Sequence, residues 1–240
     1  MEKVSAASPR GFTLIEILVS LALAGIVVSA MLGVYITSSR QSVVQDQAIV
    51  MEQNLRAGMR FLTSELKMAG YNPAAIEAGL SAPNEQPAIM AADATGIYYI
   101  KDDNGNGATD DLGDHVVFRF YDGSSLGYQE GTDSADGDGD GFPDFADTLD
   151  AVAEQLEGVE FFYQLDDGTQ VLNPAAAQRA EIVAVQVTLV ARTAWEDPRF
   201  VNETTFTGPG GTVFYDPTTA TDGFRRRMLS TLVKLRNLAI

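Results

Sequence analysis

The segment FTLIEILVSLALAGIVVSAMLGVYI, residues 12–36, is predominantly apolar. Glu16 and Tyr35 are its only residues with ionisable side chains. As a helix these 25 residues would be roughly 37 Å long, which is enough to cross a hydrocarbon core of about 30 Å. The stretch therefore predicts a helix that crosses a membrane.

A short polar leader, MEKVSAASPRG, precedes the apolar stretch and ends at Gly11. An ordinary secretory signal peptide or signal anchor is the alternative. Two features disfavour it: no small-residue cleavage site follows the run, and Glu16 lies inside it. A carboxylate in a bilayer costs about 2.5–3.5 kcal/mol on insertion scales, so Glu16 needs a partner. Cleavage before Phe12 would create an α-amino group on the same helix face, and in a filament a neighbour's amine would serve equally.

The segment RGFTLIEILVSLALAGIVVSAML, residues 10–32, resembles the class III signal of type IV pilins and type II secretion pseudopilins. The resemblance implies that a prepilin peptidase cuts after Gly11, that Phe12 is then N-methylated, and that Glu16 is the glutamate used in assembly. It also implies a single-pass inner-membrane precursor with its head in the periplasm, which later joins an extracellular pilus filament.

Helical spacing continues beyond Arg40, and Gly70 with Asn72-Pro73 ends it. The sequence predicts one helix of almost sixty residues, with two helices broken near residues 38–39 as the alternative. We expect a leader at 1–11, a transmembrane half at 12–36, an amphipathic half at 37–72 and a globular β-rich head at 73–240. The apolar stripe of the amphipathic half consists of Val44, Ala48, Met51, Leu55, Met59, Leu62, Leu66 and Ala69.

Two glycines, Gly25 and Gly33, interrupt the apolar half, where each costs about 1 kcal/mol relative to alanine. One interpretation is a weak point that stretches when the helix moves from bilayer to filament. Close packing against a neighbouring helix through small residues explains them equally well.

Beyond residue 80 the pattern is typical of β-strands. Residues 182–193 alternate as in a sheet with one buried face, so we predict an α+β fold in which an antiparallel sheet packs on the long N-terminal helix, a pilin fold. The segments FLTSELKMAGYNP (61–73) and FRRRMLSTLVKLRNL (224–238) resemble the helix end and closing strand of PilW-type minor pilins. The predicted strands are 96–100, 115–121, 159–165, 182–193 and 226–235.

The segment DGDGDGFPDFAD, residues 136–147, follows the spacing of an EF-hand-type calcium loop. Oxygen ligands at this spacing suit Ca²⁺, and the glycines allow sharp turns. The alternative is a flexible acidic loop, since the twelfth position is Asp rather than Glu and no flanking helices are evident. The expected ligands are Asp136, Asp138, Asp140, the carbonyl of Phe142, Asp144 and Asp147.

A second segment, DDNGNGATDD at 102–111, has the same alternation with Gly107 at the turn position. It predicts a second calcium site, or equally a hairpin loop rich in Asn-Gly turn residues. Its candidate ligands are Asp102, Asn104, Asn106 and Asp110.

Composition excludes several function classes. The net charge is −17, from 33 acidic and 16 basic residues, which disfavours nucleic-acid binding. The sequence has no cysteine, and its one histidine, His115, opens a predicted strand and is most simply structural. We therefore expect no enzyme. The basic run Arg225–Arg227 is either a contact for an acidic neighbour or a solvated strand start.

These observations predict a PilW-like minor pilin that primes assembly and sits at or near the filament tip. The resemblance implies other minor pilins, the major pilin, the prepilin peptidase and an inner-membrane assembly platform as partners. A J-type pseudopilin of type II secretion is the alternative in the same class. A membrane-tethered, calcium-dependent adhesin is the alternative from another class.

Overall fold

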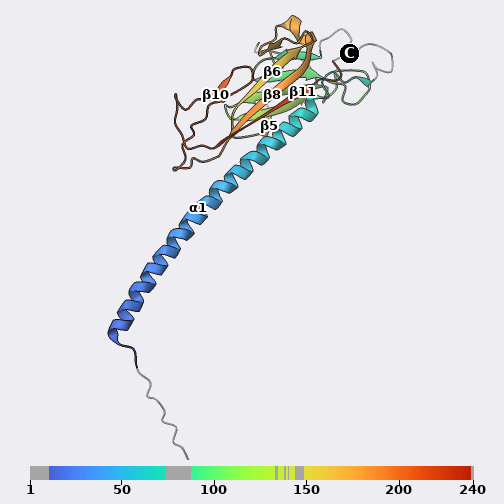
Figure 1. The fold of residues 1–240 in the computed structure, drawn as a ribbon. Coiled ribbons are helices and arrows are strands. Elements are labelled where there is room, and N and C mark those ends of the chain that lie inside the picture. Colours follow the sequence, from blue (N-terminus) through green and yellow to red (C-terminus); the bar gives the residue numbers. More distant parts are fainter. Residues whose placement is uncertain are drawn as a thin grey trace, which may run out of the picture. The chain divides into compact units, whose positions relative to one another are not determined.

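The computed structural model describes residues 11–73, 88–132, 135–137, 139, 141–143 and 149–238. A single helix, α1 (Leu14–Leu66), runs without a break through residues 38–39, so the two-helix alternative is wrong (Figure 1). The helix ends at Leu66, and turns follow to Gly70, which has a φ of +72°. The chain divides into two compact units, residues 1–46 and residues 47–240.

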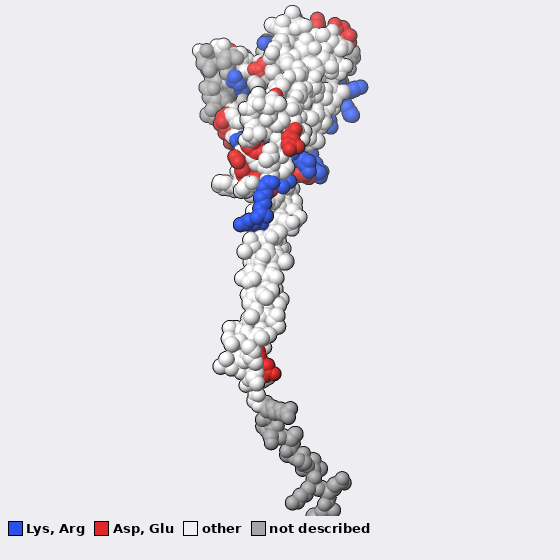
Figure 2. Space-filling view, turned by 60° about the vertical axis from the view of Figure 1, so that its left-hand side comes forward, with Lys and Arg blue, Asp and Glu red and all other residues white. Residues whose placement is uncertain are grey.

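The first unit contains the apolar part of α1. Its large apolar side chains are exposed, and its most apolar window has a mean hydropathy of 2.5 with no buried residue. By length and composition this helix is able to cross a membrane. Figure 2 shows the apolar stretch without charged side chains except for an acid near its start.

The second unit begins within the amphipathic part of α1, and the predicted stripe is confirmed from Met51 onward, whereas Val44 and Ala48 are only half-buried. Met51, Leu55, Met59 and Leu62 are at most 4% exposed and belong to the core. Gly58 lies between them and lets the helix approach β5 (Asp150–Ala153) closely. A Cβ at position 58 would lie 2.6 Å from the Cβ of Ala153.

The head has two larger sheets rather than the one that we predicted, but the α+β class is confirmed (Figure 1). All strand pairs are antiparallel. The first sheet is a meander of β1 (Ile89–Ala92), β2 (Gly96–Ile100), β3 (His115–Tyr121), β4 (Ser125–Gly131) and β5. The second has the order β11-β8-β6-β7, formed by β11 (Arg226–Lys234), β8 (Ile182–Arg192), β6 (Leu156–Leu165) and β7 (Gln170–Val171).

A hairpin of β9 (Phe206–Thr207) and β10 (Val213–Tyr215) covers part of the second sheet. The buried carboxylate of Glu160 accepts the backbone N–H groups of Gly210 at 2.8 Å and Thr212 at 3.0 Å. Because of this cover, Thr188 and Val190 on the second face of β8 are also fully buried. The prediction that β8 buries only one face is therefore wrong for this part of the strand. A 3₁₀ helix, Ala176–Glu181, precedes β8.

The first residue of β11, Arg226, is buried rather than solvated. The Arg226 guanidinium donates to Asp222 at 2.6 Å and to Glu157 at 3.2 Å, and it lies 3.6 Å from the ring centroid of Tyr215. Its side chain is 1% exposed. The other two arginines also form ion pairs within the chain but are more exposed. Arg225 pairs with Asp197 at 2.9 Å, and Arg227 pairs with Glu52 on α1 at 3.2 Å.

Candidate functional site

The start of α1 is the first candidate site. Gly11 and Phe12 lie before the first helical residue, and both are exposed, Phe12 by 87%. The peptide bond between them is therefore outside the helix and open to a protease. Glu16 follows in the first turn of α1.

Thr13 caps the helix together with Glu16. One carboxylate oxygen of Glu16 accepts the backbone N–H and the hydroxyl of Thr13, both at 2.8 Å. The Glu16 N–H in turn donates to the Thr13 hydroxyl at 3.3 Å. This reciprocal pattern is a capping box, and it gives Glu16 a partner before any cleavage. Our sequence reasoning missed Thr13, although the spacing Thr-x-x-Glu is the signature of this motif.

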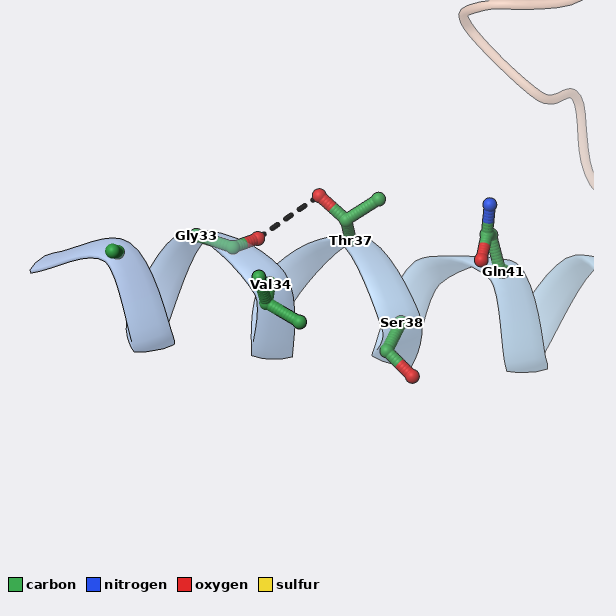
Figure 3. Close-up of a pocket in the computed structure, with 6 residues that line it drawn as sticks. Gly33, Val34, Thr37, Ser38 and Gln41 are labelled. Atoms are coloured by element: carbon green, nitrogen blue, oxygen red, sulfur yellow. Dashed lines mark hydrogen bonds between the residues drawn. The ribbon is translucent and has the colours of Figure 1, made fainter. Parts of the chain in front are cut away.

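A shallow hollow on α1 is lined by small and polar residues (Figure 3). The Thr37 hydroxyl donates to the Gly33 carbonyl at 2.9 Å, and the Ser29 hydroxyl donates to the Gly25 carbonyl at 2.8 Å. A Cβ at either glycine would meet nothing within 4 Å. The packing of this chain alone therefore does not require these glycines. The lining residues are Ala30, Gly33, Val34, Thr37, Ser38 and Gln41.

The loop at 102–111 is organised by Asp102, which is fully buried. Its carboxylate accepts three backbone N–H groups, those of Gly105 at 2.7 Å, Gly107 at 2.9 Å and Asn106 at 3.1 Å. Gly105 and Gly107 have φ values of +74° and +87°, which favour glycine. The loop is therefore a tight, satisfied structure as it stands.

The amides of Asn104 and Asn106 meet at Asp111, not at the predicted Asp110. They donate to one carboxylate oxygen of Asp111 at 2.8 Å and 2.6 Å. These two hydrogen bonds, the one from Asn104 first, hold the pKa of Asp111 below its ordinary value. The buried Asp114 closes the loop by accepting the N–H groups of Asp103 and Asp111. No spacing rule that we applied indicated Asp111 or Asp114.

The loop at 136–147 repeats part of this arrangement. Asp136 accepts the N–H of Gly139 at 2.7 Å and that of Gly141 at 3.0 Å, as Asp102 does at the corresponding positions. The Phe142 side chain is 3% exposed and packs in a small apolar cluster. Among the described residues no group of three or more His, Asp or Glu side chains is placed to hold a metal ion. The other predicted ligands, Asp138, Asp140, Asp144 and Asp147, lie outside the described residues.

Both ring nitrogens of His115 are in use. Nε2 donates to the Thr109 carbonyl at 2.9 Å, and Nδ1 accepts the hydroxyl of Tyr98. The imidazole thus ties β3 to the loop before it, as expected for a structural histidine.

Two family comparisons match the chain. The prokaryotic N-terminal methylation motif matches residues 7–32. The family described as type IV pilus-assembly protein W matches residues 143–237, most of which lie in the second sheet and the loops around it. Comparison with curated proteins finds no match.

Among solved structures, the chain is similar to a type IV-like pilin from Thermus thermophilus. The sequence identity is 16% and the TM-score 0.49, over 79% of this chain and 98% of that one.

Proposed function

We propose that this chain is a structural subunit that primes pilus assembly at or near the filament tip. The two family matches support a type IV minor pilin of the PilW type. One observation carries the proposal. The exposed Gly11–Phe12 bond lies directly before one unbroken helix. This helix begins with the cap formed by Thr13 and Glu16, continues as an exposed apolar stretch and ends in the core of the head. A subunit of this kind is released into a filament by a single cut.

The same arrangement suggests the partners and the route. The apolar part of α1 would hold the precursor in the inner membrane, with the head in the periplasm, until a prepilin peptidase removes residues 1–11. The exposed apolar face would then pack against the helices of the major pilin and of other minor pilins on the assembly platform. The methylation motif and the apolar helix support the membrane-anchored precursor. A role as an assembly subunit needs no catalytic site in the head.

The first test is mass spectrometry of the amino terminus of the protein isolated from its native membranes. We expect a mature form that starts at Phe12 and carries an added methyl group. A matched Gly11→Val variant, which changes the residue before the cut but not the helix, should remain at full length. An intact wild-type chain, or a cut after the apolar stretch, would contradict the proposal.

Deletion of the gene separates the filament roles. Loss of pili or of twitching supports the minor pilin. Loss of protein secretion with normal pili supports a J-type pseudopilin. Normal pili with poor surface attachment support the adhesin.

Calcium binding by the two acidic loops is a second proposal. The shared pattern around Asp102 and Asp136, in which one carboxylate gathers the N–H groups of the fourth and sixth loop positions, favours it. Such a turn arranges the loop backbone so that the remaining carboxylate and carbonyl oxygens can surround one ion.

Titration calorimetry of the full chain in detergent with millimolar CaCl₂ tests this proposal. We expect a binding heat and a rise in melting temperature, because an ion that binds only the folded state stabilises it by about 2.7 kcal/mol at a hundredfold excess over Kd. EDTA should reverse the rise. Asp136→Asn should weaken binding, whereas the exposed Asp166→Asn should not. Absence of both heat and stabilisation would exclude both sites.

A further inference from the structure

The outer edge of β11 is the one long, regular sheet edge in the described part of the head. β11 has nine residues and pairs with β8 from Arg226 to Lys234 without a register shift. The other ends of the two larger sheets are β1 and β5, each of four residues with an irregular register, and β7, of two residues. Proteins commonly protect their edges by shortening or bulging them, so the long regular edge of β11 is the exception here.

The register shows which backbone groups face outward. The Thr193 N–H donates to the Arg225 carbonyl, and the Leu235 N–H donates to the Val183 carbonyl, both at 2.9 Å. In an antiparallel pair the bonded residues alternate, so odd-numbered residues of β11 bond to β8. The N–H and C=O groups of Met228, Ser230 and Leu232 therefore point away from the sheet, where another strand would pair.

The side chains of these residues form an exposed apolar surface beside the open edge. Met228 is 44% exposed and Leu232 is 49% exposed, with the exposed Ser230 between them. Val233 and Leu235, on the opposite face, are buried in the core. A strand added at this edge would cover Met228 and Leu232 as well as pair with their backbone.

Charge indicates what kind of strand fits. Residues 225–236 contain five basic residues and no acid, in a chain of net charge −17. The three arginines at the start have internal acidic partners. Lys234 and Arg236 are exposed and form no ion pair with any described residue. The free end of the edge therefore favours an acidic neighbour.

The same charges disfavour a second copy of this chain. Antiparallel pairing of β11 with itself, centred on Ser230, would bring no acid to Lys234 or Arg236, since residues 225–236 contain none. Lys234 would instead lie opposite Arg226, whose charge is already paired with Asp222 and Glu157. The occupant of the edge is therefore a different segment.

We propose that the open edge of β11 binds an extended acidic segment of another protein as an additional strand, with the apolar side chains of that segment on Met228 and Leu232. Main-chain hydrogen bonds would supply affinity, and the cations at Lys234 and Arg236 would select the acidic sequence. The inference concerns the head alone and does not rest on the proposed filament role.

Residue-resolved hydrogen–deuterium exchange on the full chain in detergent tests the proposal. The probe is a short peptide with valines at the alternate positions that face Met228 and Leu232 and with glutamates at the end that meets Lys234 and Arg236, and its control has lysine in place of glutamate. We expect the glutamate peptide to slow exchange at the amides of Met228, Ser230 and Leu232 by about tenfold or more, since they become hydrogen-bonded. The lysine peptide should leave them unchanged.

Two substitutions at one position separate the backbone from the side chain. The Ser230 hydroxyl lies 2.8 Å from that of Thr188, and both Ser230→Ala and Ser230→Pro lose this contact. Only Ser230→Pro also removes the outward N–H, so it should abolish peptide binding while Ser230→Ala retains it. Both should unfold cooperatively, because the N–H at 230 is not bonded to β8. The double variant Lys234→Glu and Arg236→Glu, which leaves the backbone intact, should also lose binding.

Three outcomes would overturn the proposal. Unchanged exchange at the three amides with the glutamate peptide would show that the edge accepts no strand. Equal protection by the lysine peptide would remove the charge selection. Protection that grows with protein concentration in the absence of peptide would assign the edge to a second copy of the chain.

Discussion

At the scale of single residues, the capping box changes the account of Glu16. From the sequence we expected its carboxylate to lack a partner until cleavage supplied an amine. The structure gives it two donors from Thr13 while the leader is still attached. Both the helix end and the carboxylate are satisfied, which lowers the penalty of placing the acid at a membrane. The amine of Phe12 would arise next to Thr13, so Glu16 can exchange one partner for the other without a shift of the helix start.

The residues of the acidic loops show what spacing can and cannot predict. Alternating Asp and Asn led us to predict Asp102 and Asp136 as calcium ligands, and the structure shows in addition that each side chain bonds the backbone a few positions ahead. The closing acid of the first loop could not be predicted in this way. Asp111 accepts the two amides in a loop whose backbone is held by the buried Asp114, and the spacing of Asp and Asn carries no sign of this contact.

At the scale of elements, periodicity predicted the long helix and most of the long strands, but the seven-residue β4 was not predicted. A stripe repeated over many turns leaves little ambiguity, and the predicted strand at 115–121 agrees with β3. The short strands β1, β5, β7, β9 and β10 were missed because two to four residues carry too few alternations to show a period. Burial of both faces of β8 was missed because the hairpin that covers it is far away in sequence.

The close approach of α1 to β5 depends on the missing side chain of Gly58, so we expect a larger residue at this position to destabilise the head. Gly58→Ala improves helix propensity by about 1 kcal/mol, but its methyl group would overpack the core, which typically costs about 1–3 kcal/mol. The new Cβ would lie 2.6 Å from that of Ala153. We expect net destabilisation of the head, measured by denaturant unfolding of the full chain in detergent.

The matched control removes the opposing methyl group. Ala153→Gly alone should destabilise, but combined with Gly58→Ala it should recover most of the loss, since the two changes exchange one methyl for another across the contact. If Gly58→Ala alone stabilised the head by the full propensity gain, the close approach of α1 to β5 would be wrong.

At the scale of the whole molecule, acidic side chains outnumber basic ones, and some of the acids are neutralised by buried cations that pair with several carboxylates. Lys101 follows β2, and its side chain is 5% exposed. Its ammonium lies 3.0 Å from Asp103, 3.3 Å from Glu65 on α1 and 3.4 Å from Glu130 on β4. One cation therefore joins the helix, the first sheet and the loop that follows it. Sequence alone shows the charge excess, but these partners are up to 36 positions apart and become neighbours only in the fold.

Replacement of this cation should weaken the head far more than its change in net charge implies. Lys101→Met leaves three carboxylates without their shared partner, and breaking a buried ion pair costs about 3–5 kcal/mol. Because these carboxylates are partly exposed, we expect a loss of about 2–3 kcal/mol in the free energy of unfolding. The exposed Lys67→Met changes the net charge equally and should shift stability by no more than about 0.5 kcal/mol. Equal effects of the two variants would mean that total charge, not this cluster, limits stability.

The difference between wild type and Lys101→Met should also depend on pH. Burial lowers the pKa of Lys101, but the hydrogen bond to Asp103 and the charges of Glu65, Asp103 and Glu130 together raise it above its ordinary value. A group whose pKa is raised by folding stabilises the fold fully below its unfolded pKa of about 10.4, and the contribution disappears as the pH rises through the folded value. The gap in melting temperature should therefore be constant between about pH 7 and 9 and close at strongly alkaline pH. Lys67 has no such partners among the described residues, so the Lys67→Met variant should follow wild type over the whole pH range. A gap for Lys101→Met that persisted above the raised pKa would show that the methionine disrupts packing rather than charge.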